Sequence, residues 1–321
     1  MLFRSFNVTC AYAAGEIGYV PEPIAKVFRH HSKLARSQGV SCYRVYDRDL
    51  PEFPLIIEVY EDFIYLTEYD SKHQLTPGEH EEWWKGSVEV VKEVMDTDDA
   101  HIYAKKRQRK TDRQGQYQKI GAEGQFFQAS EGGLKFWINL SDYIDTGLFL
   151  DHRITRDKVR QLAGGKRVLN LFCYTGSFSV YAADGGAALV TSVDLSNTYL
   201  DWARRNFTLN RFFDEDKYHF VKADVLQYLH DLRPHSYDMI ILDPPTFSNS
   251  KMMKDFFDVQ RDHVTLINAL LGALSPGGLL FFSTNYRKFH LEQNLLEAAT
   301  VKDLTRSTTP FDRSEEHTSE L

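Results

Sequence analysis

Two patterns of hydrophobic and polar residues divide the chain near residue 145. Before this point, apolar residues gather in short runs rich in Tyr, Val, Ile and Phe, which predict β-strands around an amphipathic helix. After it, continuous apolar runs alternate with helical patterns, which is typical of a parallel sheet covered by helices. The pattern predicts an α/β fold, a doubly wound and mainly parallel Rossmann-like sheet preceded by a small α+β module.

Residues 1–41 form an N-terminal segment that ends in a predicted linker helix, from Pro21 to Gln38. One face of this helix is basic, and we interpret it as solvated, with contact to RNA as the alternative. The small module follows in residues 42–145. Its expected elements are strands in 42–47, 55–69 and 101–105, a helix in 79–95, and a hairpin of 125–128 with 134–140.

The larger domain, residues 146–312, is expected to alternate five strands with helices. The strands are predicted at 168–173, 189–193, 218–221, 239–242 and 279–283. The helices are predicted at 151–162, 178–183, 198–209, 225–232 and 262–274. Pro276-Gly277-Gly278 predicts a tight turn into the fifth strand.

The last nine residues, 313–321, do not continue this pattern. They are polar and aperiodic and resemble the translation of a sequencing-library adaptor, so we treat them as a non-native tail outside the fold. The natural protein is then expected to continue past Asp312, and the last strand of the sheet is expected to be missing.

Composition indicates an ordinary globular protein. The chain has 321 residues, of which 42% are hydrophobic and 26% charged. No apolar run approaches the roughly 18 residues of a membrane span, and the N-terminus lacks a secretory signal. Three scattered cysteines, Cys10, Cys42 and Cys173, form neither a metal-binding pattern nor a disulfide framework. We therefore expect a cytoplasmic protein without a metal site.

Charge is unevenly distributed. The net charge of −7 argues against a protein that coats nucleic acid along its whole surface. One segment nevertheless concentrates seven basic residues around Tyr117 with a single acid. This segment, residues 105–119, is a candidate site for nucleic-acid phosphates. Its basic residues are Lys105, Lys106, Arg107, Arg109, Lys110, Arg113 and Lys119. The family resemblance described below implies that this segment binds RNA and that residues 42–145 are an RNA-binding module.

The first predicted strand of the larger domain leads into a turn, Asn170-Leu-Phe-Cys-Tyr-Thr-Gly176, that is a candidate ligand site. Dinucleotide-binding sheets mark this turn with G-x-G-x-x-G, whose glycines admit a pyrophosphate. Only Gly176 is present here, which suits a ligand without a pyrophosphate, such as S-adenosylmethionine. The alternative is an ordinary tight turn of a parallel sheet.

Carboxylates end the next strands. Asp194 is placed to accept both hydroxyls of an adenosine ribose, and Ser196 fits better than Asp194 as the cap of the following helix. Asp224 is equally suited to an adenine amino group and to capping the helix at Val225.

The most specific motif is Asp243-Pro244-Pro245-Thr246-Phe247, at the end of the fourth strand. Two prolines cannot lie inside a sheet, so the backbone must leave it rigidly at this point. This fixes a carboxylate, carbonyl groups and an aromatic ring beside a ligand. A plain strand-ending turn would need neither the Asp nor the Phe.

Three segments together resemble class I ribosomal RNA methyltransferases: residues 142–153, 170–176 and 243–251. The resemblance is greatest to the guanine-N7 branch, the second half of bifunctional bacterial 23S rRNA methyltransferases, and residues 257–263 support that choice. It implies a small α+β module before the methyltransferase domain, and leaves a fusion to an upstream second methyltransferase open.

The resemblance also implies roles for single residues. Asp194 and Ser196 would bind the ribose and Asp224 the adenine of S-adenosylmethionine, with 23S ribosomal RNA as the partner. The loop at the methionine end of the cofactor would comprise Asn170, Phe172, Tyr174, Thr175 and Gly176. The catalytic motif would comprise Asp243, Pro244, Pro245 and Phe247.

The resemblance also bears on the methylated atom. Relatives that methylate cytosine C5 carry a Cys in the fifth-strand motif, where this chain has Thr284. Relatives that methylate exocyclic amines carry Tyr or Phe directly after the Pro pair, where this chain has Thr246. Guanine N7 is favoured, because its lone pair needs no proton removed. An exocyclic amine such as guanine N2, another rRNA base, and a non-catalytic RNA-binding relative remain alternatives.

Overall fold

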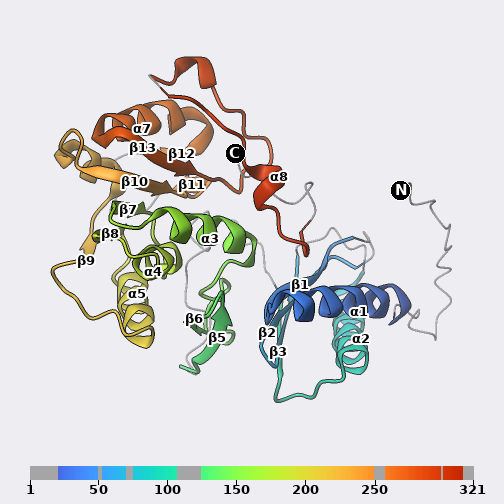
Figure 1. Cartoon of the computed structure of the whole chain (residues 1–321). Helices are drawn as coiled ribbons and strands as arrows, with labels where there is room; N and C mark the ends of the chain where they lie inside the picture. Colours follow the sequence, from blue (N-terminus) through green and yellow to red (C-terminus); the bar gives the residue numbers. More distant parts are fainter. Residues whose placement is uncertain are drawn as a thin grey trace. The chain divides into compact units, whose positions relative to one another are not determined.

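The computed structural model describes residues 21–49, 53–69, 75–106, 124–248, 257–297 and 299–313 (Figure 1). The chain divides into two compact units. The first comprises Met1–Ser37 and Arg44–Gln108, and the second Gln38–Tyr43 and Arg109–Leu321. None of the described helices is both long and apolar enough to cross a membrane.

The first unit has helices α1 (Pro21–Gln38) and α2 (Pro77–Met95) and a sheet with strand order β1-β2-β3-β4. The strands are β1 (Cys42–Asp47), β2 (Leu55–Tyr60), β3 (Phe63–Glu68) and β4 (Ile102–Lys106). β2 and β3 are antiparallel, whereas β3 and β4 are parallel and joined through α2. A capping box of Thr76 and Glu79 fixes the start of α2. These are the elements that the sequence predicts.

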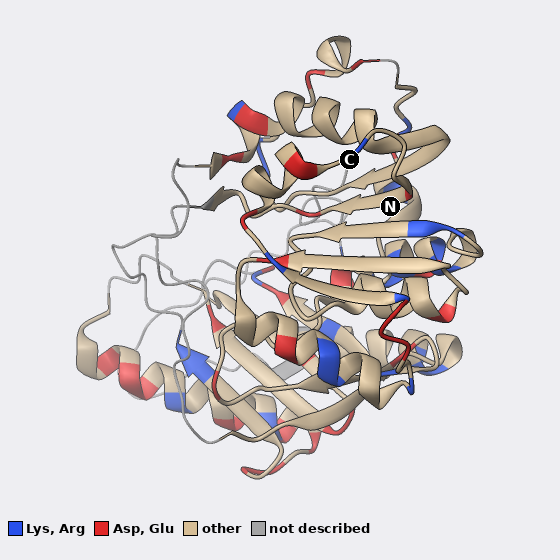
Figure 2. Cartoon of the chain, turned by 90° about the vertical axis from the view of Figure 1, so that its left-hand side faces the viewer, with Lys and Arg blue, Asp and Glu red and all other residues tan. Residues whose placement is uncertain are grey.

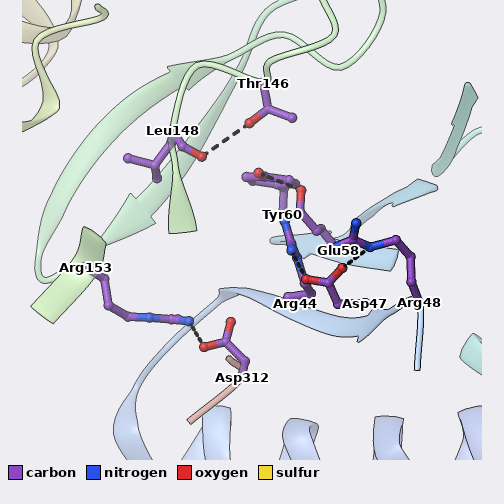
Figure 3. A network of polar contacts seen from close by, with 9 residues as sticks. All are labelled: Arg44, Asp47, Arg48, Glu58, Tyr60, Thr146, Leu148, Arg153 and Asp312. Carbon is purple, nitrogen blue, oxygen red and sulfur yellow. Dashed lines mark hydrogen bonds and ion pairs between the residues drawn. The ribbon is translucent and has the colours of Figure 1, made fainter. Parts of the chain in front are cut away.

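A polar cluster is buried in the β1–β2 part of this unit (Figure 3). Arg44 pairs with Asp47 and with Glu58, whose Oε1 lies 2.6 Å from Arg44 Nη2. The two carboxylates are almost fully buried, and Tyr60 donates a further hydrogen bond of 3.2 Å to Glu58. Arg48 also pairs with Asp47, at 2.7 Å. Because buried charge is costly unless it is paired, the two arginines make these acids tolerable within the strands.

The second unit is built on a five-stranded sheet with strand order β13-β10-β7-β8-β9, and all four pairings are parallel. The strands are β7 (Arg167–Leu171), β8 (Leu189–Asp194), β9 (Tyr218–Lys222), β10 (Tyr237–Leu242) and β13 (Leu274–Phe282). In these five strands the charged residues lie at or next to the strand ends (Figure 2). The uncharged middles are what a sheet covered on both faces requires.

Helices cover both faces of this sheet, as the sequence predicts. Figure 1 shows α7 on one face and α3, α4 and α5 on the other. The helices are α3 (Arg153–Leu162), α4 (Ser177–Asp184), α5 (Asn197–Leu209), α6 (Val225–Tyr228) and α7 (Val259–Ala273), with 3-10 turns η1 (Leu150–His152) and η2 (Leu229–Asp231). Under α7, Leu266, Ile267 and Leu270 pack in one apolar core with Leu169 and Ile240 of the sheet.

Three details near the end of the domain differ from the sequence expectation. β13 already begins at Leu274, and Pro276-Gly277-Gly278 forms an irregularity in its register, not a turn before it. Helix α7 begins at Val259 because Asp258 caps it. A short antiparallel pair, β11 (Phe247–Ser248) with β12 (Phe257–Asp258), follows the Pro pair. Beyond β13 the described chain holds only η3 (Gln293–Leu295) and α8 (Thr305–Thr308).

The hairpin consists of β5 (Phe127–Glu131) and β6 (Leu134–Ile138), so its first strand lies later than the sequence predicts. The strand pattern groups this hairpin with the small module, whereas its contacts place it in the second unit. Side chains of α5 bind the open edge of β6: Asn206 Oδ1 accepts from Trp137 N at 2.8 Å, and Trp202 Nε1 donates to Trp137 O at 2.8 Å. A hydrophobic pattern does not encode such contacts between side chain and backbone.

A buried ion pair joins the hairpin to helices α3 and α4. Arg156 of α3 donates to both oxygens of Glu131, at 2.7 and 2.8 Å, and to the carbonyl of Phe149 at 2.7 Å. Tyr181 of α4 donates to the same carboxylate at 3.0 Å. The Arg156 side chain is 1% exposed, so water cannot replace a lost partner.

We predict that Arg156→Met destabilises the second unit by about 3–5 kcal/mol, because it leaves Glu131 charged and buried. Arg204→Met is the matched control, since Arg204 pairs with Asp201 on the exposed surface of α5. Urea unfolding followed by circular dichroism measures both variants. Equal unfolding free energies for the two variants would contradict the prediction.

Candidate cofactor and catalytic site

The sheet order places the site. The chain runs outward from β7 to β8 and β9 on one side, and from β10 to β13 on the other. In such sheets ligands bind beyond the carboxyl ends of the strands where the order reverses. Here the reversal lies between β7 and β10, so the loop after Leu171 and the motif that begins at Asp243 meet at one edge.

The loop between β7 and α4 has an unusual backbone. Phe172, Tyr174 and Gly176 have φ angles of 55°, 51° and 73°. A Cβ atom on Gly176 would lie 2.8 Å from Cβ of Ala203, so this position also needs glycine for space. Left-handed conformations of bulky residues cost free energy and cluster at ligand sites. The loop is therefore held in shape by its surroundings.

Asp194, the last residue of β8, holds this loop. Its Oδ2 accepts a hydrogen bond from Tyr174 N at 3.0 Å, and its Oδ1 accepts one from Ser196 N at 2.8 Å. Burial raises the pKa of Asp194 to about 6, although these backbone bonds oppose the shift. The carboxylate thus lies against the turn, with much of its acceptor capacity used by the protein, and its binding of a ribose stays a prediction.

Further hydrogen bonds fix the rest of the loop. Thr175 Oγ1 donates to Gly147 O at 2.6 Å, and Asn206 Nδ2 donates to Thr175 O at 2.9 Å. The Asn170 side chain is buried and donates to Ser179 Oγ at 2.9 Å. Asn170 and Thr175 therefore use their side chains in hydrogen bonds within the protein. Contacts of the cofactor with the five predicted loop residues stay predictions.

Two predicted ligand residues cap helices. Ser196 is the N-cap of α5 and accepts from Tyr199 N at 3.4 Å, which confirms that Ser196 rather than Asp194 has the capping role. Asp224 is the N-cap of α6 and accepts from Leu226 N at 3.0 Å. The predicted capping role of Asp224 is thereby confirmed, and its binding of adenine stays a prediction.

The Asp-Pro-Pro motif leaves β10 at the edge of the sheet. Ser283, directly after β13, donates from Oγ to Oδ1 of Asp243 at 2.7 Å. Pro244 is buried and Pro245 is half-buried. The Phe247 ring is 43% exposed and meets Tyr286 edge-on at 6.2 Å between centroids. The motif thus presents a held carboxylate and an accessible aromatic ring on the same short segment.

The segment before α3 contributes a residue whose contact the sequence does not identify. His152 Nε2 lies 3.5 Å from Asp243 Oδ2, and its ring lies 5.5 Å from that of Phe178. A lone histidine usually has a structural role, and only its place in the motif of residues 142–153 pointed to the site. Arg153, its neighbour, instead forms a buried ion pair with Asp312 (Figure 3).

Cys173 is not a nucleophile. Its side chain is 5% exposed, and burial together with the charge of Asp194 raises the pKa of its thiol well above its usual range. A thiol must be ionised to attack, so Cys173 is a packing residue of the loop.

Most of the predicted RNA-binding segment lies outside the described residues: Arg107, Arg109, Lys110, Arg113 and Lys119. Lys105 Nζ lies 5.4 Å from the centre of the Tyr65 ring. Lys106 forms an ion pair with Glu81 and lies 5.6 Å from the Trp84 ring. Contact of these lysines with RNA stays a prediction.

Residues 95–315 match the family model of S-adenosylmethionine-dependent methyltransferases. The chain belongs to this family. It is 48% identical over 291 residues to ribosomal RNA large subunit methyltransferase K of Neisseria meningitidis, covering 90% of this chain and 82% of that methyltransferase. It is 45% identical over 285 residues to ribosomal RNA large subunit methyltransferase K/L of Pseudomonas fluorescens, covering 89% of this chain but only 37% of that longer methyltransferase.

Solved methyltransferases share the fold. A structure of an S-adenosylmethionine-dependent methyltransferase from Streptococcus mutans aligns with a TM-score of 0.66 and 28% identity, over 87% of this chain and 71% of the other. A methyltransferase complexed with SAH aligns with a TM-score of 0.67 over the same shares. The methyltransferase fold and S-adenosylmethionine as cofactor, both predicted from the sequence, are thus confirmed.

The residues at the edge of the sheet fit this cofactor. It has no pyrophosphate, and the β7–α4 loop has one glycine where a dinucleotide site needs three. It carries a ribose diol, and Asp194 offers a partly buried carboxylate at the end of the second strand.

We predict that binding of S-adenosylhomocysteine weakens as the pH falls through about 6. Ribose hydroxyls prefer an ionised acceptor, and in the free protein Asp194 takes up a proton near that pH. In Asp194→Asn the affinity should be about 10–100-fold lower at neutral pH and should lose this pH dependence. Calorimetric titration between about pH 5 and pH 8 measures both effects.

Asp201→Asn is the control, because Asp201 lies on the exposed side of α5. A fall in pH affects folding and binding in opposite directions: protonation of Asp194 stabilises the fold and weakens cofactor binding. The folded protein holds the Asp194 proton more tightly than the unfolded chain, so the ionised group destabilises the fold in full above about pH 6. This destabilisation declines as the pH falls from about 6 to the ordinary aspartate pKa of 3.8. An affinity that is independent of pH in the unmodified protein would exclude Asp194 from the cofactor site.

Proposed function

We propose that this protein transfers a methyl group from S-adenosylmethionine to N7 of a guanine in 23S ribosomal RNA. The observation that carries the proposal is the 48% identity, over 90% of this chain, to a relative named a ribosomal RNA large subunit methyltransferase. Ribosomal RNA as the substrate implies that the protein acts in the cytoplasm. The choice of N7 rests on the chemistry of the site.

The cofactor is proposed to lie along the carboxyl ends of β7, β8 and β9. Asp194 and Ser196 would bind its ribose, and Asp224 its adenine. The methionine end would lie against the loop of Asn170, Phe172, Tyr174, Thr175 and Gly176. The backbone of this loop is already fixed by Asp194 and Asn206, so binding needs little reorganisation.

The acceptor base is proposed to lie at the Asp-Pro-Pro motif. A guanine inside a helix is out of reach, so it must be flipped out and held with N7 in line with the methyl group. Phe247 has an exposed ring on which a base can stack, while Asp243 and the backbone at Pro244 and Pro245 would hold its polar edge. When bound, the cofactor supplies an electrophilic methyl group, and the carbon–sulfur electron pair returns to sulfur.

The side chains at the site favour N7 over the alternatives. Attack by cytosine C5 is assisted by a thiolate, and of the two cysteines in the described residues both are buried. Thr284, in place of the Cys of C5 methyltransferases, is 3% exposed and accepts a hydrogen bond from Tyr286 N at 3.2 Å. An exocyclic amine must lose a proton, whereas N7 offers a free lone pair, so positioning alone can accelerate the reaction.

The basic segment 105–119 is proposed to hold the RNA backbone. Phosphates attract concentrated Lys and Arg, and Tyr117 offers a ring for an unpaired base. Lys106 would exchange its bond with Glu81 for a phosphate oxygen. Such binding weakens with added salt, which distinguishes it from recognition of the base itself.

We expect label from S-adenosylmethionine to appear as 7-methylguanosine in unmodified large-subunit RNA. The test incubates the protein with the labelled cofactor and the RNA, and identifies the modified nucleoside by mass spectrometry. Label on an exocyclic nitrogen would replace the N7 assignment with the guanine-N2 alternative. RNA binding without label or cofactor binding would point to a non-catalytic relative.

We predict that Asp243→Ala lowers kcat about 100-fold while the affinity for S-adenosylhomocysteine changes less than about threefold, because the base loses its orientation. Asp238→Asn is the control: Asp238 lies near the opposite end of the same strand, where it pairs with Arg167. Steady-state kinetics and calorimetry make the comparison. Methyl transfer at the normal rate in Asp243→Ala would remove Asp243 from this role.

A further inference from the structure

The carboxylate of Asp243 has a protein partner on each oxygen. Ser283 Oγ donates to Oδ1 at 2.7 Å, and His152 Nε2 lies 3.5 Å from Oδ2. The two partners come from different parts of the chain, Ser283 from directly after β13 and His152 from η1. The carboxylate is therefore approached from two sides and cannot rotate freely.

Exposure separates the roles of the two side chains. The Asp243 side chain is 29% exposed, whereas that of His152 is 11% exposed. A bound base can therefore reach Asp243, and His152 lies behind it. The contact with Asp243 is therefore the route by which His152 can influence the base.

The segment that carries His152 also contacts the cofactor loop. Gly147 O accepts from Thr175 Oγ1 at 2.6 Å, and Asp145 O accepts from the Tyr174 hydroxyl at 3.3 Å. The His152 ring lies 5.5 Å from Phe178, in the first turn of α4. One short segment, residues 145–152, thus touches both the loop proposed to hold the methyl donor and the residue proposed to hold the acceptor.

We propose that His152 is a positioning residue that orients the Asp243 carboxylate and sets it in place relative to the cofactor loop. The proposal rests on the proposed function, in which Asp243 holds the acceptor base. A misplacement of about 1 Å between reacting groups can cost about 100-fold in rate. A contact that fixes Asp243 relative to the cofactor loop therefore affects the rate of methyl transfer directly.

A simple packing role for His152 predicts different behaviour. If its ring only fills space against Phe178, a side chain of similar volume serves equally well. Leucine approximates the volume without a donor, whereas glutamine carries an N–H donor that can reach the carboxylate. The comparison of His152→Leu with His152→Gln therefore separates orientation from packing.

We expect His152→Leu to lower kcat about 10–100-fold, while the affinity for S-adenosylhomocysteine changes less than about threefold. His152→Gln should retain kcat within about threefold. His219→Leu is the control, because His219 is exposed on β9. Equal kcat values for the Leu and Gln variants, with both melting temperatures lowered, would overturn the proposal.

A second measurement needs no RNA. Melting temperatures of His152→Leu, Asp243→Ala and the double variant form a cycle that reports whether the two side chains interact. We expect the double variant to melt close to the less stable single variant. Additive shifts would overturn the contact even if RNA is methylated. A coupled cycle in a protein that labels no RNA would instead overturn the proposed function and leave the contact standing.

Discussion

The reversal of strand order between β7 and β10 is the constraint on which the rest of the site depends. All five strands are parallel, so their carboxyl ends lie at one edge. At the reversal the loops on either side turn away from each other, which leaves room for a ligand at that point. Three segments far apart in sequence meet there: residues 145–152, 172–176 and 243–247.

Asp194 holds the loop between β7 and α4 in one conformation. Two bulky residues, Phe172 and Tyr174, adopt left-handed backbone conformations that cost free energy in isolation. The hydrogen bond from Tyr174 N to the carboxylate offsets part of that cost. The raised pKa of Asp194 reflects the burial that makes this bond strong, and it also leaves the group responsive to a ligand. The carboxylate that is proposed to bind the ribose is thus also the one that fixes the shape of the loop.

The sequence predicts those parts of the structure that depend on neighbouring residues better than those that depend on contacts between distant residues. Continuous apolar runs predict β7, β8, β9 and β10 to within about two residues, because burial on both faces leaves no polar positions. The fifth strand starts earlier than predicted because a Pro-Gly-Gly stretch reads as a turn, although β13 passes through it with an irregular register. The hairpin was harder to place, since Asn206 and Trp202 bind its edge from 69 and 65 residues away.

The candidate site shows the same limit. Asp194, Gly176 and Asp243 could be found from strand ends and turn chemistry, which are local. The contact between His152 and Asp243 spans 91 positions of the chain and leaves no periodic trace in the sequence. Only the fold brings such side chains together.

Methylation of guanine N7 is consistent with the way in which the polar groups around the site are used. Ser179 accepts from Asn170 and from Ser192, Thr175 is bonded on both its hydroxyl and its carbonyl, and Ser283 is bonded to Asp243. These bonds fix positions in advance of binding, and groups fixed in advance need no reorganisation during the reaction. An N7 lone pair demands alignment and no proton acceptor, so a site whose polar groups hold one another in place is well matched to that atom.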